Sequence, residues 1–143
     1  MENLNNIVET MIFQHRVLQK DLGAVSVLTK EEKPNSEEII KLLKQFATDL
    51  SAHLQLENDV FYVQLLKKMK DQGQDTADTE QFILEMKKIG DTVMAFLGKY
   101  KEAASVANEI VAFTQELNGI IPILNLRIES EESGVYDYWK LYK

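Results

Sequence analysis

Apolar residues recur along almost the whole chain at spacings of three and four positions, while the alternating pattern of a half-buried strand is absent. A spacing of three and four places apolar side chains on one face of an α-helix. Breakers divide the pattern into four stretches, which we predict as helices over residues 3–28, 35–70, 76–100 and from 105 onward. The pattern therefore predicts an all-α protein.

Local signals support these boundaries. The segment TKEEKPNSEE, which holds one of the two prolines, separates the first two helices. Asn35 is followed three positions later by Glu38, a capping-box arrangement that satisfies the free amides at the start of a helix. The segment DQGQDTAD forms the second turn. Residues 1–143 are expected to form a single domain.

The segment NGIIP lies in the middle of the fourth predicted helix, where Gly119 and Pro122 can stop or bend a helix. The apolar spacing continues through both residues, so we predict a kink near Pro122 and not an end. Four long helices with short connections are typical of an antiparallel up-down-up-down four-helix bundle.

Five ionisable side chains occupy positions that the apolar spacing assigns to the core. They are His15 in the first helix, His53 and Glu57 in the second, and Arg127 and Glu131 in the fourth. Residues four apart lie on one face of a helix. A buried charge without a partner is strongly unfavourable, so we expect these groups to face one another in one site.

The second and fourth helices resemble each other around these residues. HLQLENDVFYVQL, residues 53–65, aligns with RIESEESGVYDYW, residues 127–139, so that Glu57 falls on Glu131 and His53 on Arg127. A single histidine on an apolar row is more often a hydrogen-bonded core residue than a ligand, and the aromatic residues at 61, 62 and 136 are interpreted as core. Only the convergence of all five groups favours a site. Imidazole and carboxylate groups inside a helical bundle form the ligand set for iron, manganese or zinc.

Composition narrows the classes of function. The absence of cysteine excludes thiolate metal sites and cysteine nucleophiles, and a formal charge of −7 disfavours nucleic acid and anionic membrane surfaces as partners. There is no apolar run long enough to span a bilayer and no signal-peptide pattern, so we expect a soluble cytoplasmic protein. No catalytic motif is recognisable, and we expect no enzyme.

In its polar core residues the sequence resembles the hemerythrin-like family, also called HHE cation-binding proteins, which bind iron and oxygen in a four-helix bundle. IFQHRVL is similar to the family's first-helix pattern, HLQLENDVFY to its second, and IPILNLRIESEESGVY to its fourth. The resemblance covers the whole chain. It implies a non-heme iron site with His15, His53, Glu57 and Glu131 as ligands.

The sequence also departs from that family, which usually holds two irons with five histidines. This chain has two histidines; Met86 and Arg127 stand where histidines are usual. The departures imply one divalent ion, with Arg127 neutralising the two glutamates in place of a second cation. Met86, Glu80 and Glu85 are further candidate ligands on the third helix.

Two functions remain open at this point. The favoured one is binding or sensing of a metal ion, or of a diatomic gas such as O2 or NO through it, with iron, manganese or zinc as the ion. The alternative is a metal-free bundle held by a buried Arg-Glu-His network, which serves as a structural or protein-interaction module with an unknown protein partner.

Overall fold

The computed structural model describes residues 6–142, and over that range the chain is all-helical, as the apolar spacing predicts. Its segments are α1 (Ile7–Thr29), α2 (Ser36–Leu56), the π-helical segment η2 (Glu57–Phe61), α3 (Tyr62–Asp71), α4 (Ala77–Lys99), α5 (Ala103–Asn108), α6 (Ile110–Ser133) and α7 (Val135–Tyr142). The predicted helix start at residue 3 lies outside the described residues. None of the helices in this range is long and apolar enough to cross a membrane.

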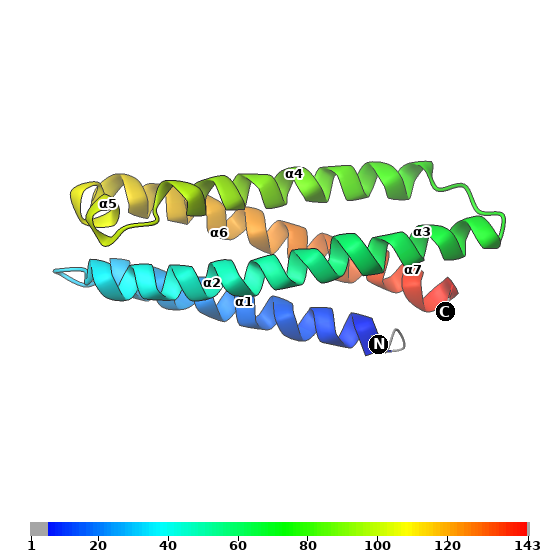
Figure 1. The fold of residues 1–143 in the computed structure, drawn as a ribbon, viewed down its shortest axis with the longest axis horizontal. Coiled ribbons are helices and arrows are strands. Elements are labelled where there is room, and N and C mark those ends of the chain that lie inside the picture. Colours follow the sequence, from blue (N-terminus) through cyan, green and yellow to red (C-terminus); the bar gives the residue numbers. More distant parts are fainter. Residues whose placement is uncertain (1–5, 143) are drawn as a thin grey trace.

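The helices run lengthwise beside one another (Figure 1). The chain reverses direction after α1, after α3 and again through α5, so the start of α1 and the end of α7 lie at the same end of the molecule. Helix α1 packs against α2 and α6, and α4 packs against α2, α3 and α6. This arrangement brings inward-facing side chains from different helices within reach of one another.

Two turns follow their sequence signals. The side chain of Asn35 caps α2 by accepting a hydrogen bond from the backbone amide of Glu38 at 3.1 Å. Gly73 follows α3 with φ of 70°, a left-handed conformation that glycine adopts without steric cost.

Interruptions in two of the long helices correct the prediction of four unbroken ones. The π-helical turn η2 separates α2 from α3, a break at Gly134 separates α6 from α7, and the short α5 precedes α6. An interruption of about one residue leaves the apolar spacing on either side intact, so the spacing does not reveal it. Helix α6 continues through Pro122 and does not end there. A bend at this proline stays a prediction.

Two apolar clusters fill the bundle, one on each side of a polar layer. The larger cluster includes Leu18 and Leu50, and the smaller includes Met11 and Phe61. His15 lies between Met11 and Leu18 along α1, so the polar layer is sealed from solvent by hydrophobic packing at both ends.

Val60, Phe82 and Ile89 lie on the apolar spacing of their helices, and the structure leaves them only half-buried. The extra residue of the π-helical turn changes the rotational phase of the helix, so Phe61 and Tyr62 are buried and Val60 is not. On α4 the buried row runs through Ile83 and Gly90, one position beyond each of the two predicted residues.

Candidate metal site

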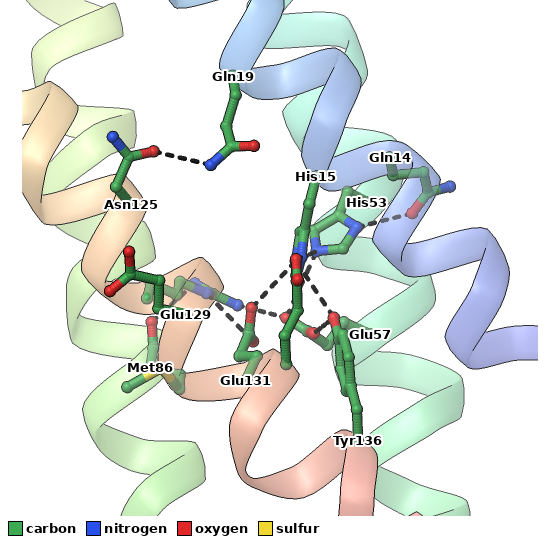
Figure 2. A network of polar contacts seen from close by, with 12 residues as sticks. Gln14, His15, Gln19, His53, Glu57, Met86, Asn125, Glu129, Glu131 and Tyr136 are labelled. Atoms are coloured by element: carbon green, nitrogen blue, oxygen red, sulfur yellow. Dashed lines mark hydrogen bonds and ion pairs between the residues drawn. The ribbon is translucent and has the colours of Figure 1, made fainter.

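All five ionisable residues predicted to share a site lie together in the polar layer. Helix α1 supplies His15, α2 supplies His53, η2 begins with Glu57, and α6 supplies Arg127 and Glu131. None of the five exposes more than 3% of its surface. Figure 2 shows the two histidines and the two glutamates pointing toward one another from different helices.

The two imidazole rings meet at their Nε2 atoms, which are 3.1 Å apart. The opposite nitrogen of each ring has its own partner. His15 Nδ1 lies 2.8 Å from Glu132 Oε2, and His53 Nδ1 lies 2.7 Å from Gln14 Oε1. Both rings are therefore held from outside, with their Nε2 atoms turned toward the two glutamates.

The guanidinium of Arg127 joins the two carboxylates. Nη2 donates to Glu57 Oε1 at 2.6 Å, and Nε donates to Glu131 Oε2 at 3.3 Å. The remaining guanidinium nitrogen, Nη1, donates to the backbone carbonyl of Met86 on α4 at 2.7 Å. A Cβ at Gly90 would lie 2.6 Å from Nη1, so α4 needs glycine there to admit the guanidinium.

Two tyrosine hydroxyls also donate to the carboxylates. Each tyrosine contacts the glutamate of the other of the two aligned stretches, residues 53–65 and 127–139. Tyr62 donates to Glu131 Oε2 at 2.6 Å, and Tyr136 donates to Glu57 Oε2 at 2.8 Å. The sequence interpretation treats both tyrosines only as core residues. The alignment of the two stretches already pairs Tyr62 with Tyr136, and that pairing is the signal for their equivalent roles.

The backbone interruptions explain why these tyrosines reach the site. Each tyrosine follows the glutamate of its own stretch by five residues (62 − 57 and 136 − 131), one more than the α-helical spacing for a shared face. The wider turn of η2 supplies the extra residue after Glu57. After Glu131 the break at Gly134 does so, and a Cβ there would lie 2.7 Å from the Ser130 carbonyl oxygen.

Sequence reasoning also missed Gln14 and Glu132, the partners of the outer imidazole nitrogens. Each is adjacent in the chain to a predicted site residue, on a part of the helix surface that the apolar spacing leaves polar. Glu132 is adjacent to the predicted Glu131, but only the packing of α6 against α1 reveals that Glu132 contacts His15.

The pKa values of the two buried glutamates shift in opposite directions. Burial raises the pKa of Glu57, and the neighbouring Glu131 carboxylate raises it further. Burial also acts to raise the pKa of Glu131, but contacts with the neighbouring polar side chains and the charge of Arg127 outweigh burial and lower that pKa to about 2. Ionisation of both glutamates together is therefore favoured by a further positive charge in the site.

The imidazole of His53, on α2, is held in its neutral form by this environment. Burial, followed by the proximity of His15, lowers the pKa of His53 to about 3. Near pH 7 this imidazole is uncharged, which is the form that coordinates metal ions.

Of the three additional candidates on the third predicted helix, Glu80 and Glu85 lie outside the buried site. Glu80 and Glu85 are exposed, and each carboxylate accepts a hydrogen bond from a residue four positions earlier. Their prediction as ligands is wrong, because the inward face of α4 is the one that carries Met86 and Gly90. Met86 is buried, and it contributes its backbone carbonyl to Arg127.

The remaining four residues fit a divalent metal ion. His15, His53, Glu57 and Glu131 each offer a ligand atom, and these atoms all lie within 4.8 Å of one another. Ligands about 2.0–2.2 Å from one ion lie up to roughly 4.4 Å apart, so only small adjustments are needed. Glu131 Oε1 is buried 3.3 Å from His15 Nε2 and accepts no hydrogen bond from residues 6–142, as expected where a cation would complete its contacts.

A small cavity adjoins these groups. The volume of the cavity is about 10 Å³, and its polar wall is formed by His15, His53, Arg127 and Glu131. Gly90 and aliphatic side chains form the rest. A space of this size holds about one water or another small molecule.

The fold and the site define a helical bundle with a buried histidine and glutamate centre suited to a cation. The family model of the hemerythrin HHE cation-binding domain matches residues 6–139, nearly the whole chain. The protein therefore belongs to the hemerythrin HHE cation-binding family. Neither a curated protein nor a solved structure matches the chain.

Proposed function

We propose that this protein binds one divalent metal ion per chain, held by His15, His53, Glu57 and Glu131. Iron is the first choice, and manganese or zinc are alternatives that the same ligands accept. The function is binding or sensing of the ion, or of a diatomic gas in its presence, and not catalysis. The ion supplies the positive charge at which the four side chains converge.

The observation that carries this proposal is the contact between the two Nε2 atoms at 3.1 Å beside Glu131 Oε1, which accepts no hydrogen bond. Glu132 and Gln14 offer acceptor oxygens to the outer Nδ1 atoms, so both Nε2 atoms carry lone pairs. Lone pairs repel one another at such distances in a low-dielectric interior. A shared cation changes that repulsion into coordination.

Arg127 is the reason for one ion instead of two. Its guanidinium already bridges Glu57 and Glu131 and is anchored on Met86. Burial would lower the pKa of Arg127, but the charges of Glu131 and Glu57 raise it, so the side chain stays a fixed cation. A second metal ion at these carboxylates would meet this charge directly.

The adjoining cavity supports the gas-binding part of the proposal. Its polar wall includes both imidazoles, and the remaining lining is apolar. A small uncharged molecule such as O2 or NO is compatible with both the volume and the lining. A larger ligand is not.

A metal-free network is the second candidate function, and one observation favours it. Arg127 contacts both carboxylates, so the bundle already has an internal counter-ion without metal. In that case the site is structural and the bundle serves as an interaction module.

Metal stoichiometry separates the two functions. The purified protein is stripped with a chelator, loaded anaerobically with Fe(II), Mn(II) or Zn(II), and analysed for metal after gel filtration. We expect about one ion per chain in the parent, a large loss in Glu57→Gln, and no change in the control Glu37→Gln, which alters an exposed glutamate on α2. Two ions per chain would refute the mononuclear site, and no retained metal would favour the network.

A further inference from the structure

The nitrogens on the outer side of the two imidazoles determine what the inner nitrogens can do. Glu132 Oε2 lies 2.8 Å from His15 Nδ1, and an ionised carboxylate only accepts hydrogen bonds. Gln14 Oε1, also an acceptor, lies 2.7 Å from His53 Nδ1. Both Nδ1 atoms therefore carry the proton. A neutral imidazole with its proton on Nδ1 has a lone pair on Nε2.

Within the part of the chain that the structure describes, the close contacts of His15 Nε2 on the inner side include no competing donor. His53 Nε2 lies at 3.1 Å and Glu131 Oε1 at 3.3 Å, and both are acceptors. The Tyr136 hydroxyl lies at 3.2 Å, but its proton is directed to Glu57 Oε2 at 2.8 Å. The two lone pairs are therefore oriented toward one position, where a single cation would contact both.

Glu132 and Gln14, the partners of the outer imidazole nitrogens, both lie near the protein surface. The Glu132 side chain is 22% exposed, and its other oxygen accepts from Arg16 Nη2 at 2.5 Å. Gln14 is half-buried and lines a surface hollow with Phe13 and Asp49. Neither belongs to the apolar clusters, so both can be replaced with little disturbance of the core.

We propose that Gln14 and Glu132 are positioning residues that hold His53 and His15 in the Nδ1–H tautomer, so that both Nε2 lone pairs point to one cation position. The importance of this tautomer for affinity rests on the metal binding proposed above. Partners of this kind fix the ring orientation and the basicity of a ligating histidine, and their loss typically lowers metal affinity about 10-fold to 100-fold.

The direct test is the tautomer of each histidine in the metal-free protein. Long-range ¹H–¹⁵N NMR correlations distinguish Nδ1–H from Nε2–H rings, and with two histidines in the chain the signals are assigned by single substitution. We expect Nδ1–H for both rings in the parent. Gln14→Met should move the proton of His53 to Nε2, and Glu132→Ala should do the same for His15.

Matched variants separate positioning from general damage. Glu129→Ala removes an exposed glutamate from α6, and Gln55→Met changes an exposed glutamine on α2; both should leave the tautomers unchanged. Glu132→Gln keeps a carbonyl acceptor, so it should restore the Nδ1–H tautomer that Glu132→Ala loses.

Zinc affinity, measured by competition with a chromophoric chelator, is the second readout. Gln14→Met and Glu132→Ala should each bind Zn(II) about 10-fold to 100-fold more weakly than the parent, with the controls unchanged. Unchanged tautomers in these two variants would overturn the inference, whatever the affinity. If the tautomers shift as expected but the parent binds none of Fe(II), Mn(II) and Zn(II), the positioning stands and the proposed metal function fails.

Discussion

Replacement of Arg127 by histidine distinguishes a cation substitute from a purely structural bridge. The guanidinium makes three hydrogen bonds, to Glu57, to Glu131 and to the Met86 carbonyl, and only 3% of the residue is exposed. Loss of one partner from a buried charged network costs about 3–5 kcal/mol. At about 2–4 °C per kcal/mol for a chain of this size, Arg127→His without metal should melt roughly 6–20 °C below the parent.

Metal should recover much of that loss if Arg127 stands in for a second ion. The substitution removes a fixed charge beside two carboxylates and supplies an imidazole, so the variant should bind more metal per chain than the parent. Ligand binding to the folded state adds about 2.7 kcal/mol of stability at a free concentration 100 times the dissociation constant. That amount offsets at least half of the expected loss.

The assay is thermal unfolding followed by circular dichroism, combined with metal analysis, for parent and variant with and without anaerobic Fe(II). Arg127→Met is the matched comparison, because it removes the same charge without supplying an imidazole. It should be destabilised to a similar degree and should gain less metal than Arg127→His. An Arg127→His protein that is destabilised but gains no metal and no stability from Fe(II) would refute the substitution argument and support the metal-free network.

Three further predictions concern the surroundings of the site. Gly90→Ala should destabilise the fold by about 1–3 kcal/mol in urea unfolding, because the added Cβ would overlap Arg127. Gly119→Ala should stabilise it by about 0.5–1 kcal/mol, because a Cβ at this helical position meets no described atom within 4 Å. Equal effects of the two substitutions would contradict the packing argument. Tyr136→Phe should cost about 1–3 kcal/mol in the same assay, since Glu57 Oε2 loses its buried donor, and an unchanged midpoint would show that the hydroxyl contact contributes nothing. Burial and the neighbouring Asp49 raise the pKa of Asp21 from 3.8 to about 7. Between about pH 4 and pH 7 the Asp21 carboxyl is therefore ionised in the unfolded chain but still protonated in the folded one, so the free energy of unfolding falls as pH rises. Asp21→Asn should therefore stabilise the protein at pH 8 by about 1–2 kcal/mol, after allowance for solvent screening, and should change little at pH 4; a gain of equal size at both pH values would contradict the pKa argument.

The sequence alone was enough to predict the all-helical class and the five ionisable residues of the buried polar layer. Helical periodicity is local, because each apolar row depends only on spacings of three and four within one segment. His15, His53 and Arg127 each interrupt such a row, and a buried charge must find a partner. These two facts place the groups in one site before any packing is known.

Tertiary structure decided which other side chains join that site. The exposure of Glu80 and Glu85 depends on how α4 is rotated against its neighbours, and the contact between Gln14 and His53 depends on how α1 packs on α2. A row of apolar positions defines a face only approximately. A rotation of the helix by one residue decides whether a carboxylate faces the site or the solvent.

The crossed tyrosine contacts have the same origin. Tyr62 and Tyr136 reach the opposite glutamates only because η2 and the break at Gly134 each add one residue to the turn. An inserted residue leaves the spacing before and after it unchanged, so a sequence pattern does not register it. The sequence determined that charged groups meet inside the bundle, and the packing between helices determined which atoms they meet, because hydrogen-bond geometry depends on helical phase to within a single residue.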